Sequence, residues 1–122
     1  MVEPRNKAEA LSLARMAVDA AADKKAENII LLDLRKLSSV ADYFVICSGV
    51  VDRQLEAIAG HVQEVLRSEY GQKPRHVEGN GDAGWVLVDY VDVVVHVFTP
   101  SLRTYYNLEG LWMPAPVLLR IQ

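Results

Sequence analysis

Apolar residues recur along this chain with two different spacings, and the alternation between these spacings predicts an α/β fold. Residues 5–23 and 53–70 carry apolar side chains three and four positions apart, as in a helix with one buried face. Short runs rich in Val, Ile and Leu are typical of strands. The predicted strands cover residues 29–34, 43–48, 73–78, 85–89 and 93–99, and a third helix follows at residues 100–110.

Residues with strong capping preferences mark the ends of the predicted helices. Asp52 is placed to cap the second helix by accepting hydrogen bonds from the free amides of its first turn, and Gly71 suits a left-handed stop after it. Thr99 is the expected cap of the third helix, with Pro100 at its first position and Gly110 at its end.

The order of the elements predicts a mixed β-sheet. The strands at residues 85–89 and 93–99 are joined by a tight turn and are expected to be antiparallel neighbours. Connections through helices require at least one parallel pair in the same sheet. Residues 29–34 begin apolar on both faces and suit an interior strand, whereas Pro74 places its strand at an edge because proline has no amide hydrogen. Residues 117–121 either add a last strand or lie on the surface.

Length and composition predict the number of domains and the kind of partner that the protein can bind. The 122 residues are 51% hydrophobic and contain no repeat or long linker, so we expect one small α/β domain over residues 1–122. A net charge of −3 argues against non-specific binding to nucleic acid and is compatible with a basic protein partner. The N-terminus has no apolar signal core, and no apolar run approaches the ~18–20 residues that span a bilayer. We therefore expect a cytoplasmic protein without membrane contact.

Acidic and nucleophilic residues give little indication of catalysis. Two-metal phosphoryl transfer needs paired carboxylates, which on one strand would lie two residues apart. Asp89 and Asp92 instead flank a turn, where aspartate is common, and Asp33 stands alone in its strand. The single cysteine, Cys47, lies in an apolar run and is interpreted as a buried structural thiol. A small nucleotidyltransferase-like, nucleotide-binding enzyme remains the alternative to a binding protein.

Histidine and glycine patterns predict neither a metal nor a cofactor. His61, His76 and His96 are far apart in the sequence and form no recognisable zinc-ligand pair. The glycine-rich residues 79–84 precede a strand rather than a helix, unlike a phosphate-binding loop. His96 alternates with valines and faces away from them, so it is either an ordinary histidine, with its hydrogen bonds satisfied or partly exposed, or part of a binding face.

Aromatic residues concentrate between residues 85 and 112, which contain both tryptophans and three of the five tyrosines. Trp85 lies on the face of its strand opposite the valines. Helical geometry turns Tyr106 about a quarter of a circle away from Tyr105, so one tyrosine is expected to be buried and the other offered outward. We predict that Trp85 and Tyr106 contact a partner and that Trp112 lies at the rim of the core.

Four motifs stand in order along the chain, at residues 37–46, 48–54, 84–100 and 106–112. Together they resemble the ribosomal silencing factor family, also called the Iojap family, over about residues 8–112. The resemblance implies an α/β domain related to a minimal nucleotidyltransferase core that lacks the catalytic acids of that superfamily. Residues 113–122 would be a C-terminal extension.

The resemblance also implies a function that is regulatory rather than enzymatic. Members of the family bind the large ribosomal subunit through ribosomal protein number fourteen, with little or no direct contact to nucleic acid. They sterically block joining of the small subunit and lower translation when nutrients are scarce, and a second role in late assembly of the large subunit is open. Exposed strand edges and aromatic surface also allow a homodimer.

The predicted partner-binding residues follow from these motifs. By resemblance, Trp85 and Tyr106 match aromatic positions that contact the ribosomal protein. Acidic side chains match positions near that surface, which suits a basic partner. The full predicted set is Trp85, Asp89, Asp92, His96, Tyr105, Tyr106 and Glu109.

One residue departs from the family pattern. Members usually carry glycine where this chain has Val91, in the turn between Tyr90 and Asp92. Glycine would allow a positive φ there, whereas valine in that conformation is strained. Either the turn differs in this chain or the strain is tolerated.

Overall fold

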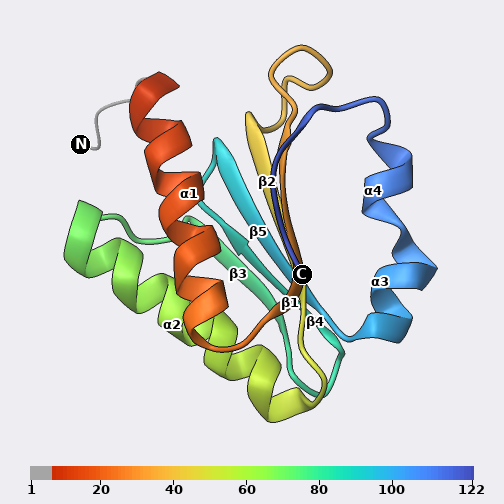
Figure 1. The fold of residues 1–122 in the computed structure, drawn as a ribbon. Helices are drawn as coiled ribbons and strands as arrows, with labels where there is room; N and C mark the ends of the chain where they lie inside the picture. Colours follow the sequence, from red (N-terminus) through yellow and green to blue (C-terminus); the bar gives the residue numbers. More distant parts are fainter. Residues whose placement is uncertain (1–6) are drawn as a thin grey trace.

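The computed structural model describes residues 7–122 and confirms the α/β class, with helices on both sides of one sheet (Figure 1). The first two residues of the predicted N-terminal helix lie outside the described part. The elements are α1 (Lys7–Asp23), β1 (Glu27–Asp33), β2 (Tyr43–Ser48), α2 (Asp52–Tyr70), β3 (His76–Asn80), β4 (Trp85–Asp89), β5 (Val93–Phe98), α3 (Pro100–Tyr106), α4 (Leu108–Leu111) and β6 (Val117–Ile121).

The six strands form one mixed sheet in the order β3-β4-β5-β2-β1-β6. Only β2 and β5 pair in parallel, with Ile46 opposite His96, and the other neighbours are antiparallel. The predicted parallel pair, the antiparallel β4–β5 pair and the interior place of β1 are thereby confirmed. β3 is an edge strand as predicted, although it begins at His76 rather than Lys73. The last segment, left open by the sequence, forms the opposite edge as β6.

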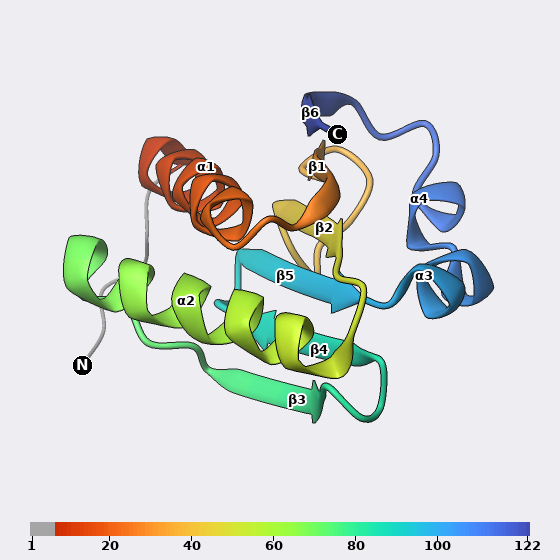
Figure 2. The same cartoon turned by 60° about the horizontal axis from the view of Figure 1, so that its bottom comes forward.

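One face of the sheet is covered by α1 and α2, which pack side by side against it (Figure 2). The side of α1 that enters this core is rich in alanine, including Ala14, Ala17 and Ala21, all fully buried. These short side chains let the helix axis lie close to the strands. The α2 side of the core is built by larger residues such as Leu55 and Ile58, as the apolar spacing predicted.

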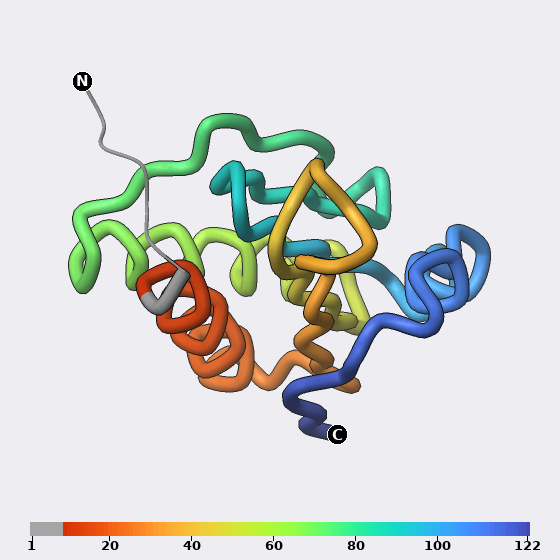
Figure 3. The backbone as a smooth tube through the Cα atoms, turned by 90° about the horizontal axis from the view of Figure 1, so that it is seen from above, coloured from red at the N-terminus to blue at the C-terminus, as the bar shows by residue number. Residues whose placement is uncertain are grey.

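The second face of the sheet is covered only in part, by α3, α4 and the segment that returns to β6 (Figure 3). Phe44 and Phe98 form its buried floor. Trp112 packs edge-on against Phe44, with the ring centroids 6.0 Å apart, which confirms its predicted place at the rim of the core. Because the cover is incomplete, Trp85 and Leu87 of β4 remain half-buried on this face.

The ends of the helices confirm some capping predictions and correct others. Gly71 is left-handed, with φ 64°, and ends α2 as predicted. The prediction for Asp52 is wrong: the cap position belongs to Val51, which has no capping side chain, and Asp52 is the first helical residue. The Asp52 carboxyl instead hydrogen-bonds that of Asp82, which raises the pKa of Asp52 because a second acidic group disfavours its charged form.

The third predicted helix is broken into two. Thr99 caps α3 by accepting a hydrogen bond from the Leu102 amide, and Pro100 is its first residue, as predicted. The predicted end at Gly110 is wrong, because Asn107 adopts φ 45° and closes α3 three residues earlier. The Asn107 side chain then accepts from the Gly110 amide and so starts α4.

Val91 adopts φ 79°, so the turn keeps the conformation that favours glycine and the chain tolerates the strain. Asp89 supports the turn, since its carboxylate accepts a hydrogen bond from the Val91 amide at 2.7 Å. The predicted role of Asp89 in the turn is confirmed. The Asp92 carbonyl, on the far side of the turn, accepts hydrogen bonds from the amides of Asp42 and Tyr43 and ties the turn to the start of β2.

Val91→Gly should therefore raise the free energy of unfolding by about 0.5–1 kcal/mol. Removing the side chain relieves about 1–2 kcal/mol of left-handed strain, offset in part by the greater freedom of glycine in the unfolded chain. Urea denaturation measures the change. Val91→Ala is the matched control, because it keeps Cβ and most of the strain. A glycine variant no more stable than the alanine variant would contradict the strain argument.

Candidate functional site

The aromatic cluster, defined as Trp85, His96, Phe98, Tyr105 and Tyr106, lies on the partly covered face where β4, β5 and α3 meet. Trp85 begins β4 opposite Phe98, the last residue of β5, and their rings stack 5.0 Å apart. Because α3 follows β5 after one residue, it brings Tyr106 to 4.7 Å from Trp85. Sheet register and a short connection thus bring together residues far apart in the sequence.

Gly84 allows α3 to pack closely on the start of β4. It has φ 77°, and a Cβ at this position would lie 2.6 Å from the Leu102 side chain. Its carbonyl accepts a hydrogen bond from the Thr99 amide at 2.9 Å. A glycine directly before Trp85 therefore fixes the distance between the tryptophan and α3.

The two tyrosines differ from the prediction, because neither is buried. Tyr105 is 77% exposed and Tyr106 45% exposed. α3 is only seven residues long and has no fully buried residue, so neither of its faces is enclosed by the core. Tyr105 packs edge-on against Tyr106 at 5.1 Å, and both rings are available to a partner.

His96 is buried next to Trp85, which excludes the partly exposed histidine among its interpretations. It is 4% exposed, and Phe44 packs against it at 4.6 Å. Its Nδ1 accepts a hydrogen bond from the Trp85 indole Nε1 at 3.2 Å. Burial lowers the pKa of His96 to about 4, and the negative charge of Asp89 opposes this shift. His96 therefore lies in the buried layer next to the exposed rings, and its contact with a partner stays a prediction.

The predicted acidic residues are largely engaged inside the molecule. Arg75 donates to the carboxylate of Asp89 at 2.6 Å, and the Asp89 side chain is only 14% exposed. Arg103 forms an ion pair with Glu109 at 2.9 Å. Asp92 is half-buried at the β4–β5 turn. These carboxylates therefore offer a basic partner less free charge than the sequence suggested.

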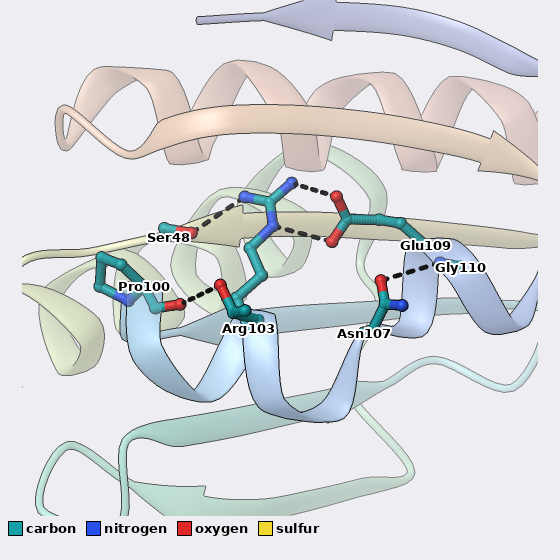
Figure 4. A network of polar contacts seen from close by, with 7 residues as sticks. Ser48, Pro100, Arg103, Asn107, Glu109 and Gly110 are labelled. Carbon is teal, nitrogen blue, oxygen red and sulfur yellow. Dashed lines mark hydrogen bonds and ion pairs between the residues drawn. The ribbon is translucent and has the colours of Figure 1, made fainter.

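Arg103 is a functional candidate that sequence reasoning missed. Its side chain is 10% exposed, and its guanidinium lies between the Ser48 hydroxyl at the end of β2 and the Glu109 carboxylate on α4 (Figure 4). Ser48 is 55 residues away in the sequence, so no local pattern signals this contact. The network holds α3 and α4 at a fixed angle above the sheet and so places both tyrosines.

A small pocket adjoins the exposed side of the aromatic cluster. Its volume is about 170 Å³, well below the ~300–1,000 Å³ of typical small-molecule sites, and closer to the size of one side chain. Trp85 and Tyr106 form part of its wall, together with Glu78 at the β3–β4 hairpin. The remaining lining residues are Gly79, Ala83, Leu87 and Leu102.

Comparison with known proteins identifies the family. The family model described as ribosomal silencing factor during starvation matches residues 7–121. The chain belongs to this family. The match includes β6, so it extends beyond the motifs that end at Trp112.

Curated relatives and solved structures of the ribosomal silencing factor family agree with this assignment. A ribosomal silencing factor of Bacillus subtilis is 48% identical over 106 residues, which cover 87% of this chain and 89% of that one. The chloroplastic protein Iojap of Zea mays is 35% identical, covering 91% of this chain and 48% of its own length. A crystal structure of a Chromobacterium violaceum protein is 40% identical, with a TM-score of 0.81 and coverage of 85% and 86%.

Two side chains of chemically reactive types, Cys47 and Asp33, are buried or ion-paired in this chain. Cys47 is buried as predicted, and burial raises the pKa of its thiol to about 12. Arg35 forms an ion pair with Asp33 at 2.7 Å, and the resulting hydrogen bonds lower the pKa of Asp33. Within residues 7–122, no group of three or more His, Cys, Asp or Glu side chains is placed to hold a metal ion. No helix in the same part is long and apolar enough to cross a bilayer.

Proposed function

We propose that this protein binds the large ribosomal subunit through ribosomal protein number fourteen and blocks joining of the small subunit, which lowers translation under nutrient limitation. Family membership supports the regulatory role, since the relatives are named silencing factors. The rings of Trp85, Tyr105 and Tyr106 are at least partly exposed, and this observation supports the aromatic cluster as the surface that contacts the partner. Clustered aromatic side chains beside a pocket are typical of energetic hot spots.

The mechanism in this proposal is steric and needs no chemical step. Trp85 and Tyr106 supply large rigid rings that lose little conformational freedom on binding. The adjoining pocket is sized for one side chain of the partner. Asp89 and Glu109 are paired with arginines, so they add little free charge to this surface. Apolar contact therefore provides most of the affinity, and the net charge of −3 chiefly guides the approach of a basic partner.

Sedimentation of ribosomal subunits through a sucrose gradient tests the proposal. Added protein should migrate with large subunits and reduce the fraction of joined ribosomes when small subunits are then supplied. Binding to isolated ribosomal protein number fourteen should compete with binding to the subunit. Migration at the top of the gradient with unchanged joining would refute the proposal. Joining that is unchanged despite co-migration would point to the assembly role instead.

The enzyme alternative has its own test. Calorimetry with Mg²⁺ and nucleoside triphosphates would detect a nucleotide site directly. Micromolar binding would support a nucleotide-binding function, and absence of heat under conditions in which the protein binds subunits would argue against it. Analytical ultracentrifugation of the free protein, with and without subunits, would establish whether a homodimer forms and whether it competes with the proposed partner.

A further inference from the structure

The Trp85 indole makes a directed hydrogen bond that selects its orientation. A tryptophan ring can occupy two broad, roughly opposite orientations about its second side-chain torsion, and both fit a loosely apolar site. Indole Nε1 is a donor only, and here it donates to Nδ1 of His96 at 3.2 Å. Turning the ring over would point this donor away from the histidine. The hydrogen bond therefore favours one of the two orientations.

The same hydrogen bond fixes the tautomer of His96. Since Nδ1 accepts, the proton of the neutral ring must lie on Nε2. Nε2 is buried and has no hydrogen-bond partner among the described residues. A buried, unpartnered donor is unfavourable, so a ring that served packing alone would be better replaced by phenylalanine. The neighbours of His96 are themselves aromatic, with Phe44 at 4.6 Å and Phe98 at 6.0 Å.

The selected orientation matters because of what lies on either side of the indole. The Trp85 ring stacks on that of Phe98, with the ring centroids 5.0 Å apart. The Tyr106 ring lies 4.7 Å from Trp85, and both Trp85 and Tyr106 line the pocket. A reversed indole would change the wall of that pocket and the surface shared with Tyr106.

We propose that His96 is a positioning residue, whose Nδ1 holds the Trp85 indole in the orientation that presents Trp85 and Tyr106 together to a protein partner. The inference deepens the proposed function and rests on it for the identity of the partner. His96 itself does not touch the partner, because its side chain is buried. Its role is to make one binding geometry predominate before the partner arrives, which lowers the entropic cost of association.

Nuclear magnetic resonance of the unaltered protein provides the first test. Uniform ¹⁵N labelling should reveal a coupling across the hydrogen bond between Trp85 Nε1 and His96 Nδ1. The imidazole ¹⁵N shifts should be those of the ring protonated at Nε2. Observation of the tautomer protonated at Nδ1 would overturn the proposal, and this result does not depend on any variant folding correctly.

Two matched variants provide the second test. His96→Phe keeps an aromatic ring but removes the acceptor, whereas the amide oxygen of His96→Asn lies near the position of Nδ1. The Phe variant should shift the Trp85 indole resonance, speed exchange of its proton with water and weaken binding to large subunits about tenfold. The Asn variant should restore most of the shift and the affinity. Trp112, on the same face of the sheet but packed on Phe44, is the internal reference, and its indole resonance should shift less than that of Trp85.

The outcomes separate this inference from the proposed function. An unchanged Trp85 resonance in His96→Phe, or equal loss of affinity in both variants, would overturn the positioning role. A shifted resonance with full affinity would show that the orientation is not used in binding and would also overturn it. If the unaltered protein does not bind large subunits, the proposed function fails, whereas the resonances still report whether His96 orients Trp85.

Discussion

Replacing Tyr106 by alanine should weaken binding to the large ribosomal subunit at least about 30-fold, equivalent to about 2 kcal/mol. The ring is 45% exposed, so it can bury new surface against a partner. It also packs 4.7 Å from Trp85 and forms part of the pocket wall, so its removal alters the neighbouring contact as well. Titration of fluorescently labelled protein with purified large subunits measures the change.

Three comparisons make this prediction specific. Tyr106→Phe keeps the ring and should retain most of the affinity. Val40→Ala removes an apolar side chain that is 76% exposed on the β1–β2 loop, away from the aromatic cluster, and should bind normally. Trp85→Ala should act in the same direction as Tyr106→Ala, but it also uncovers His96 and needs a stability measurement beside it. Full affinity in Tyr106→Ala, or an equal loss in Val40→Ala, would place the interface elsewhere.

The sheet was largely predictable because alternation along a strand directly encodes which side is buried. In β4, Val86 and Val88 are buried and Trp85 is half-buried, as the two-residue period predicted. The break between α3 and α4 was missed because it depends on one residue. Asparagine tolerates a left-handed conformation and can cap a helix with its side chain, so the residue type at position 107 is compatible with such a break.

The contacts of the site were less predictable than its location. Arg75 lies 14 residues from Asp89, and Arg103 reaches Ser48 at a separation of 55 residues. Such contacts depend on how the elements meet, and periodicity within one element carries no information about them. The burial of His96 was ambiguous for a related reason: its strand is interior and fully buried, so neither face of β5 is exposed. The sequence therefore located the aromatic cluster but not the residues that hold it in place.

The free energy of unfolding should fall by up to about 3 kcal/mol as the pH is lowered from about 6.5 to about 4, through the titration of His96 alone. Burial lowers the pKa of His96 from 6.5 to about 4 in the folded protein. The unfolded chain therefore takes up a proton on His96 throughout this window while the folded protein does not. Stability is full above the unfolded pKa, is lost as the pH falls toward the folded pKa, and no longer changes through this group below it.

Urea denaturation at a series of pH values, for the unaltered protein and for His96→Asn, isolates this effect. The other ionisable groups are the same in both proteins and cancel in the difference, including Asp33, whose pKa is lowered by its hydrogen bond with Arg35. Asp89, on the neighbouring strand, is also present in both, and its charge opposes the shift that burial causes. The difference between the two proteins should change by up to about 3 kcal/mol between pH 6.5 and 4. A constant difference would mean that His96 is solvated, and the Trp85 indole would then lack a buried acceptor.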